Sequence, residues 1–149
     1  MKQFRYQLET VLRYKNQVLD DKRGQYAAAV RRTEKKRAEI DHLDGSMKEL
    51  CHGMDKKVMS GSTIEDIRLY DMCINHLSNT IRQEKELLAG LEKEQEKKKN
   101  EVVYANVDAS RYEKLKDRRF GEYRKEEQKA QEQFIEEFVS YKNGSQKVV

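Results

Sequence analysis

Apolar residues recur in alternating steps of three and four along the second half of the chain. Between Ile67 and Tyr112 this seam carries mostly Ile, Leu, Val, Ala and Tyr, with polar residues at 84, 95 and 98. A repeat of about 3.5 residues keeps one narrow stripe of a helix facing a partner helix. The spacing therefore predicts a coiled-coil helix.

The first half carries a similar pattern without proline. Its clearest seam, again in steps of three and four, is Ile40, Leu43, Met47, Leu50 and Met54. Nearer the start, Phe4, Leu8, Val11, Leu12, Val18 and Leu19 form a broader apolar stripe. These two stripes predict a first helix over about residues 3–59.

A short break, Ser60-Gly61-Ser62-Thr63, separates the two patterns. Ser62 stands three residues before Glu65, which is the spacing of a capping box at a helix start. The second helix is predicted over about residues 63–142, where Asn143-Gly144 supplies a left-handed stop. Residues 143–149 are then expected to form a frayed tail.

Two helices joined by so short a turn are expected to lie antiparallel. A turn centred near residue 62 gives four apolar layers, namely Met54 with Tyr70, Leu50 with Ile74, Met47 with Leu77, and Leu43 with Ile81. Farther from the turn the opposed positions become more polar. The packing is therefore predicted to be tightest beside the turn.

The predicted fold is all-α, a long antiparallel two-helix coiled-coil hairpin forming a single domain over residues 1–149. The second helix is the longer and extends unpaired from about residue 121. This extension still carries an apolar stripe of Tyr123, Ala130, Phe134, Ile135, Phe138 and Val139. A partner protein that covers the stripe is the favoured interpretation; self-association and fraying are the alternatives.

Composition agrees with long solvated helices. Charged residues make up 39% of the chain and hydrophobic ones 36%, and proline and tryptophan are absent. Disorder is the alternative for so polar a chain, but the regular placement of Ile, Leu and Val argues against it. A two-helix hairpin offers no concave pocket for chemistry, and neither a phosphate-binding loop nor a nucleophile motif occurs. We therefore expect that the protein is not an enzyme and binds no cofactor.

The positive charge is local. Residues 1–40 carry eleven Lys or Arg against five Asp or Glu, and residues 114–125 are also basic. A hairpin would bring these segments together, where they could attract an acidic protein surface. The mixed Glu and Lys residues of the second helix are interpreted as solvated faces. Without an aromatic platform for bases, nucleic-acid binding is the less favoured alternative.

No run of 18 apolar residues occurs, so direct membrane insertion is not expected. The amphipathic N-terminus lacks the apolar block of a signal peptide, and a cytoplasmic location is the simplest expectation. Cys51 with His52 and Cys73 with His76 could conceivably hold zinc near the turn. Inert thiols are the favoured interpretation, and an accidental disulfide is the remaining alternative.

Both ends of the chain resemble the flagellar export protein family FliJ. The first segment is FRYQLETVLRYKNQVLDDKRGQYAAA, an aromatic and a leucine-valine-leucine stripe leading into alanines. The second is YEKLKDRRFGEYRKEEQKAQEQFIEEF, with Arg-Arg, a Tyr-Arg-Lys-Glu-Glu stretch and an acidic-aromatic finish. Residues 131–137 depart from the family pattern, which would be more basic there.

The resemblance implies a soluble component of the flagellar type III export apparatus, similar in shape to the central stalk of rotary ATPases. Such a protein would insert its helix ends into the export ATPase hexamer and promote ring assembly. It would also link the ring to the membrane export gate protein and handle export chaperones. A virulence-type secretion stalk and a nucleic-acid-binding helical hairpin remain the alternative functions.

Two groups of residues fit these roles. The residues expected to meet the ATPase ring are Phe4, Leu8, Leu12, Leu115, Arg118, Arg119 and Tyr123. Those expected to meet the export gate or chaperones are Leu43, Leu50, Leu69, Tyr70 and Cys73. Core packing is the alternative for Leu43, Leu50 and Tyr70, and a solvated charged face is the alternative for the two arginines.

Overall fold

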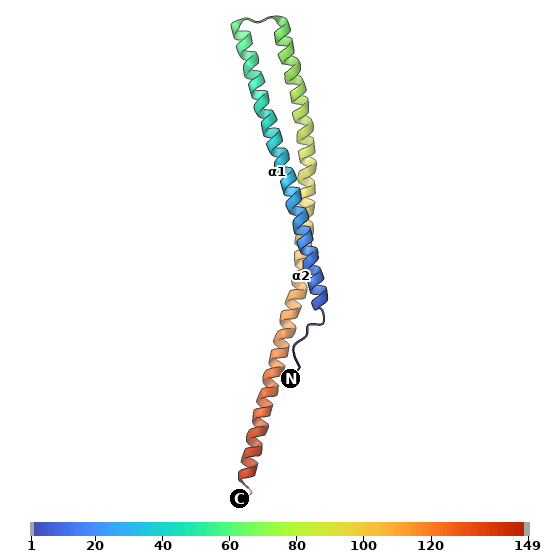
Figure 1. Ribbon diagram of the computed structural model, residues 1–149, viewed down its shortest axis with the longest axis vertical. Coiled ribbons are helices and arrows are strands. Elements are labelled where there is room, and N and C mark those ends of the chain that lie inside the picture. Colours follow the sequence, from blue (N-terminus) through green and yellow to red (C-terminus); the bar gives the residue numbers. More distant parts are fainter. Residues whose placement is uncertain (1, 148–149) are drawn as a thin grey trace. The chain divides into compact units, whose positions relative to one another are not determined.

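The computed structural model describes residues 2–147 and contains two long helices (Figure 1). Helix α1 spans Glu9–Ser60 and has 52 residues, and helix α2 spans Ile64–Gln146 and has 83. No strand occurs among the described residues. The predicted all-α antiparallel hairpin with a longer second helix is confirmed.

Contacts divide the chain into two compact units. The hairpin unit is Asp20–Val103, and the end unit combines Met1–Leu19 with Tyr104–Val149. Each unit contains part of both helices, packed side by side. The single domain expected over residues 1–149 stays a prediction.

The turn of the hairpin unit begins with a left-handed glycine. Gly61 directly follows α1 and has φ 76°, a conformation that costs an L side chain about 1–2 kcal/mol. At the start of α2, the Asp66 N–H donates to Thr63 Oγ1 at 3.3 Å. The cap is therefore Thr63 and not the predicted Ser62, because Thr63 immediately precedes the first helical residue. Ser62 instead donates to the Asp66 carboxylate at 3.0 Å.

Two polar contacts between the helices of the hairpin unit agree closely with the predicted register. Lys22 Nζ lies 3.4 Å from Glu101 Oε2, and Lys98 Nζ donates to Gln25 Oε1 at 3.2 Å. Both pairs fall within one position of the expected layers. The register read from two separate apolar seams therefore also aligns the polar side chains.

In the interhelical ion pairs of the hairpin unit, the cation comes from α1 and the carboxylate from α2. The pairs are Lys22–Glu101, Arg32–Glu94, Lys36–Glu84 and Arg37–Glu92. Glu84, Glu92 and Glu94, predicted to lie on solvated faces of the second helix, are instead paired with cations of α1. Much of the positive charge of α1 is therefore used within the unit.

One lysine and two glutamates of the hairpin unit show the electrostatic effect of neighbouring opposite charges. Hydrogen bonds to Glu84 and then Glu39 raise the pKa of Lys36, and the hydrogen bond from Lys36 lowers the pKa of Glu39. Burial tends to raise the pKa of Glu101, but Lys22 and Lys98 together outweigh it and lower that pKa. The charged forms of these groups are thus favoured by the folded hairpin.

The tightest packing of the hairpin unit lies away from the turn. Ala29, Thr33, Ile40 and Ile81 are buried, and the Thr33 hydroxyl donates to the Ala29 carbonyl at 3.0 Å. The predicted layers beside the turn are mostly half-buried. The expectation of a tight turn end is wrong, because small residues such as Ala29 and Thr33 permit a closer approach than Met and Tyr do.

Both predicted outer helix boundaries need correction. Helix α1 begins at Glu9, not near residue 3, because Phe4 and Tyr6 are engaged in contacts with α2 in a non-helical segment. Helix α2 continues to Gln146, through the predicted stop at Asn143-Gly144. Glycine permits a left-handed conformation but does not require it. Residues 148 and 149 of the expected frayed tail lie outside the described residues.

Glycine substitutions in the hairpin unit should have opposite effects on stability. A Cβ at Gly90 would meet no atom within 4 Å, so Gly90→Ala should raise the free energy of unfolding by about 1 kcal/mol. Gly61→Ala should lower it by about 1–2 kcal/mol, because alanine is strained at positive φ. Urea denaturation followed by circular dichroism measures both. Equal effects of the two changes would contradict this account of the turn.

Candidate partner-binding surfaces

Aromatic contacts fasten the segment before α1 onto α2 in the end unit. The Phe4 ring packs edge-on against Phe120 with centroids 5.2 Å apart, and its centroid lies 5.5 Å from that of Tyr123. The Tyr123 hydroxyl donates to the Lys2 carbonyl at 2.9 Å. Buried Tyr6 donates to the Tyr112 carbonyl at 3.0 Å. These contacts bring two of the predicted ring-binding residues, Phe4 and Tyr123, together.

The leucines predicted for the same surface differ in their exposure. Leu12 is only 4% exposed and belongs to the core of the end unit. Leu8 and Leu115 are half-buried. Leu12 can therefore support a binding surface but offers almost no area to a partner, whereas Leu8 and Leu115 retain some.

Basic side chains of the end unit fall into two classes. Lys15 pairs with Asp108 at 2.7 Å and Lys116 pairs with Glu9 at 2.9 Å, and these hydrogen bonds raise the pKa of both lysines. Arg118 and Arg119 are exposed, and neither belongs to an ion pair within residues 2–147. The two arginines are thus among the exposed basic groups that remain available to a partner, as are Arg124 and Lys125 on the same helix.

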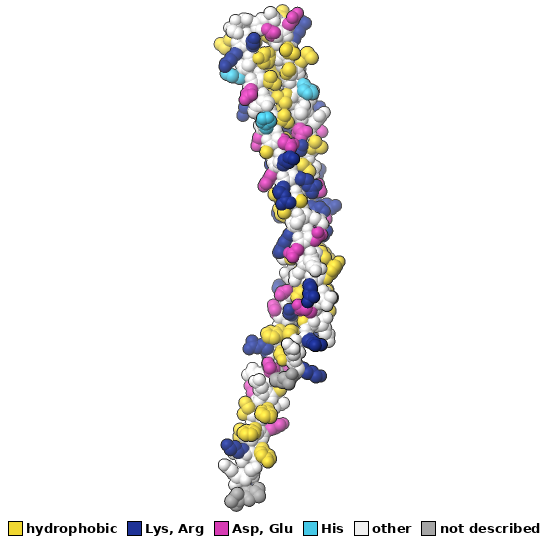
Figure 2. Space-filling view, viewed as in Figure 1, with side chains coloured by type: hydrophobic (Ala, Val, Ile, Leu, Met, Phe, Trp, Pro, Cys, Tyr) yellow, Lys and Arg dark blue, Asp and Glu magenta, His cyan; other side chains and the backbone are white. Residues whose placement is uncertain are grey.

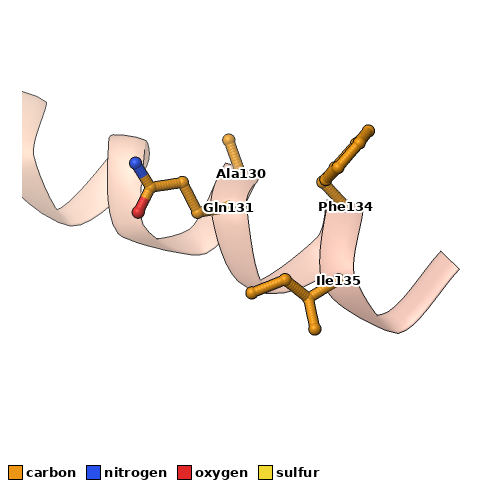
Figure 3. Close-up of a pocket in the computed structure, with 4 residues that line it drawn as sticks. All are labelled: Ala130, Gln131, Phe134 and Ile135. Atoms are coloured by element: carbon orange, nitrogen blue, oxygen red, sulfur yellow. The ribbon is translucent and has the colours of Figure 1, made fainter. Parts of the chain in front are cut away.

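Beyond Tyr123, an exposed apolar strip continues along α2. We define the exposed strip as Phe134, Ile135, Phe138, Val139 and Tyr141, with Phe134 70% and Tyr141 77% exposed. Figure 2 shows hydrophobic side chains gathered on this part of the end unit. A shallow hollow is lined by Ala130, Gln131, Phe134 and Ile135 (Figure 3).

The turn end of the hairpin unit is a second apolar surface. Leu43, Leu50 and Tyr70 are half-buried, whereas Leu69 and Cys73 are exposed. An open hollow of about 290 Å³ is lined by Leu50, Lys57, Asp66, Leu69, Tyr70 and Cys73. Four of the five residues predicted for the gate or chaperones therefore share one hollow; Leu43 does not line it.

Sequence reasoning missed several exposed apolar residues around the same turn. They are Val58, Met59, Ile64 and Met72, and Met59 is 90% exposed. Hydrophobic side chains are visible over this end of the hairpin unit in Figure 2. For Met59 and Met72 the available signal was a position outside the 3.5-residue seam, since apolar residues off the seam have no partner helix to face. Val58 and Ile64 keep the seam spacing but lie at the ends of the two helices beside the turn.

The structure does not assemble the zinc ligands considered from sequence. Cys51 and Cys73 are free and exposed, and residues 2–147 contain no group of three His, Cys, Asp or Glu placed to hold a metal ion. The cysteines are not small hydrophobes packed at the seam. Among the described residues, neither helix has a stretch apolar enough to cross a membrane.

Comparison with known proteins identifies relatives along nearly the whole chain. The family model described as "Flagellar FliJ protein" matches residues 4–147. A protein of that name from Bacillus subtilis (strain 168) is 26% identical over 130 residues, covering 87% of this chain and 86% of the relative. No solved structure matches the chain.

The aromatic cluster can be tested through the segment that it fastens. Phe4→Ala removes both ring contacts and should free residues 2–8, with a loss of about 1 kcal/mol in local stability. Hydrogen exchange of the Glu9 amide, which donates to the Tyr6 carbonyl at 3.1 Å, should become faster. Tyr14→Ala, which removes an aromatic ring that is 61% exposed, is the matched control and should leave this exchange unchanged. Unchanged exchange in Phe4→Ala would contradict the anchoring role.

Proposed function

Because this chain belongs to the flagellar FliJ family, we propose that it is a non-enzymatic stalk or adaptor of the flagellar type III export apparatus. In this proposal its helix ends enter the ring of the export ATPase hexamer and promote ring assembly and activity. Its turn end reaches the membrane export gate protein and the export chaperones. The protein acts in the cytoplasm, peripherally associated with the membrane-bound apparatus.

The observation that supports ring binding is the combination of surfaces in the end unit. Arg118 and Arg119 are exposed next to Phe120, which is 43% exposed and packs on Phe4. Farther along the same helix lies the exposed strip. A protein that must hold a slender helix end needs such apolar anchors beside unpaired charges, because aromatic and arginine side chains supply most of the energy of typical interfaces.

The turn end of the hairpin unit supports a separate contact. Leu69 contributes exposed apolar area, and its hollow is bordered by Lys57 and Asp66. An apolar centre with charged groups at its rim is the usual composition of a protein interface. A gate or chaperone contact here would leave the end unit available to the ATPase.

The two alternative functions have less support. The family match and the Bacillus subtilis relative are both described as flagellar, which favours a flagellar over a virulence-type system. A nucleic-acid-binding hairpin would need an unneutralised basic surface. Several lysines and arginines of α1 are instead paired with carboxylates of α2.

Ring binding is tested by reversing the two available arginines. Arg118→Glu/Arg119→Glu should weaken pull-down of the cognate export ATPase by about tenfold or more and abolish stimulation of its ATP hydrolysis, since like charges across an interface repel. Both side chains are exposed, so circular dichroism should show an intact fold. Lys97→Glu/Lys99→Glu makes the same change of charge at exposed positions of the hairpin unit and is the control. Equal loss in both variants, or no loss in either, would refute the assignment.

The turn-end contact is tested by Leu69→Asp, which places a charge at a side chain that is 62% exposed. Binding to the cytoplasmic domain of the gate protein should fall by about tenfold, because a central apolar anchor is lost. Stimulation of the ATPase should stay unchanged. Leu87→Asp, at a similarly exposed leucine farther from the turn, is the control for titration calorimetry. If Leu69→Asp bound the gate protein as well as the unchanged chain, this contact would be excluded.

A further inference from the structure

The exposed strip continues the seam by which α2 packs on the rest of the end unit. Ala105 and Ala109 are buried, and Phe120 and Tyr123 then meet the Phe4 ring. With similar steps of three and four, the same face continues as Glu127, Ala130, Phe134, Phe138 and Tyr141. No described residue covers this later part, where Phe134, Phe138 and Tyr141 are each at least 60% exposed. A helix lying against α2 as α1 does would complete the seam.

We propose that the exposed strip binds an amphipathic helix of a partner protein, with an apolar strip on one face and Lys or Arg along both edges of that strip. The proposal rests on the proposed function only for the identity of the partner, which would then belong to the export apparatus.

The shape of the contact surface depends on Ala130, a small residue that lies next to the larger Phe134. Ala130 and Phe134 point to the same side of α2 with Gln131 next to Ala130, whereas Ile135 points away from them around the helix (Figure 3). These four residues line an open hollow of about 420 Å³. In a coiled coil, each apolar side chain of one helix enters a hole formed by four residues of the other. The hollow at Ala130 therefore fits one large apolar side chain from the occupant.

The charge expected of the occupant follows from the residues that border the exposed strip. Residues 126–137 contain five Glu and a single Lys. Glu137 follows Phe134 by three residues and precedes Tyr141 by four, so it borders one edge of the strip. Glu132 and Glu136 stand three residues before Ile135 and Val139 and border the other edge. Acidic edges on both sides favour an occupant with basic edges.

The same charges argue against other occupants. A second copy of this segment would bring two sets of glutamates together along one short contact, which like-charge repulsion disfavours. An anionic lipid surface attracts basic helices, not a segment with this excess of carboxylates. A solvated isolated helix would have no need for five large apolar side chains on one side. A basic-edged helix satisfies both the apolar strip and its edges.

Two designed peptides test the proposal with the full chain. Both are helices of roughly 20 residues with the same Leu and Ala strip; one carries Lys along both edges and the other Glu. Each is labelled and titrated by fluorescence polarisation. The Lys-edged peptide should bind at least about tenfold more tightly than the Glu-edged peptide, and the difference should shrink as salt is raised.

Variants of the strip locate the binding site. Phe134→Ser/Phe138→Ser should weaken binding of the Lys-edged peptide by at least about tenfold. Glu132→Lys/Glu137→Lys, one change on each edge, should reverse the preference toward the Glu-edged peptide. Leu87→Ser changes an exposed leucine of the hairpin unit and should leave both affinities unchanged. Circular dichroism of each variant checks that the helices are retained.

Several results would overturn the proposal. Equal binding of the two peptides, or no binding of either, would remove the charge-selected helix site. Binding unaffected by Phe134→Ser/Phe138→Ser would place it elsewhere. A concentration-dependent dimer in sedimentation experiments, lost in the same variant, would identify a second copy as the occupant. ATPase stimulation measured in parallel separates the two proposals, because it can fail while the Lys-edged peptide still binds, or persist when that peptide does not.

Discussion

Each helix of this chain has a narrow apolar strip along one face. That strip is exposed to water unless a second helix packs against it. Packing α1 against α2 solves this within each unit, and the register of the pair follows from two seams that must face each other. The ion pairs of the hairpin unit add to that constraint. A shifted register would separate the particular pairs Lys22–Glu101, Lys36–Glu84 and Arg37–Glu92 as well as the apolar layers.

The end unit shows what happens where that constraint is only partly met. Phe4 covers α2 at Phe120 and Tyr123, but α1 begins only at Glu9 and nothing described covers the strip beyond. The seam therefore changes from an internal contact into a surface suited to a partner. The same sequence pattern serves stability where α1 is present and binding where it is absent, so one helix can carry both roles.

The candidate surfaces were only partly predictable from the sequence. Phe4 with Tyr123, and Leu50, Leu69, Tyr70 and Cys73, were grouped correctly because facing positions follow from the register. The burial of Leu12 was not predicted, because heptad spacing does not show how closely two helices approach each other. The exposed residues Met59 and Met72 were not predicted, because they lie off the 3.5-residue seam. The pairing of Lys15 with Asp108 and of Lys116 with Glu9 depended on side-chain reach, whereas Arg118 and Arg119 stay exposed and outside these pairs.

The sequence by itself determined the helix type, the position of the turn and the pairing of the helices, because the 3.5-residue period and the glycine at the break are local signals. The flagellar family was also indicated by residues at both ends. Only the tertiary structure decided where the packing is tight, which helix start is replaced by an aromatic anchor, and which charges neutralise one another. Those outcomes depend on side-chain volume and distance across two helices, and a one-dimensional pattern contains neither.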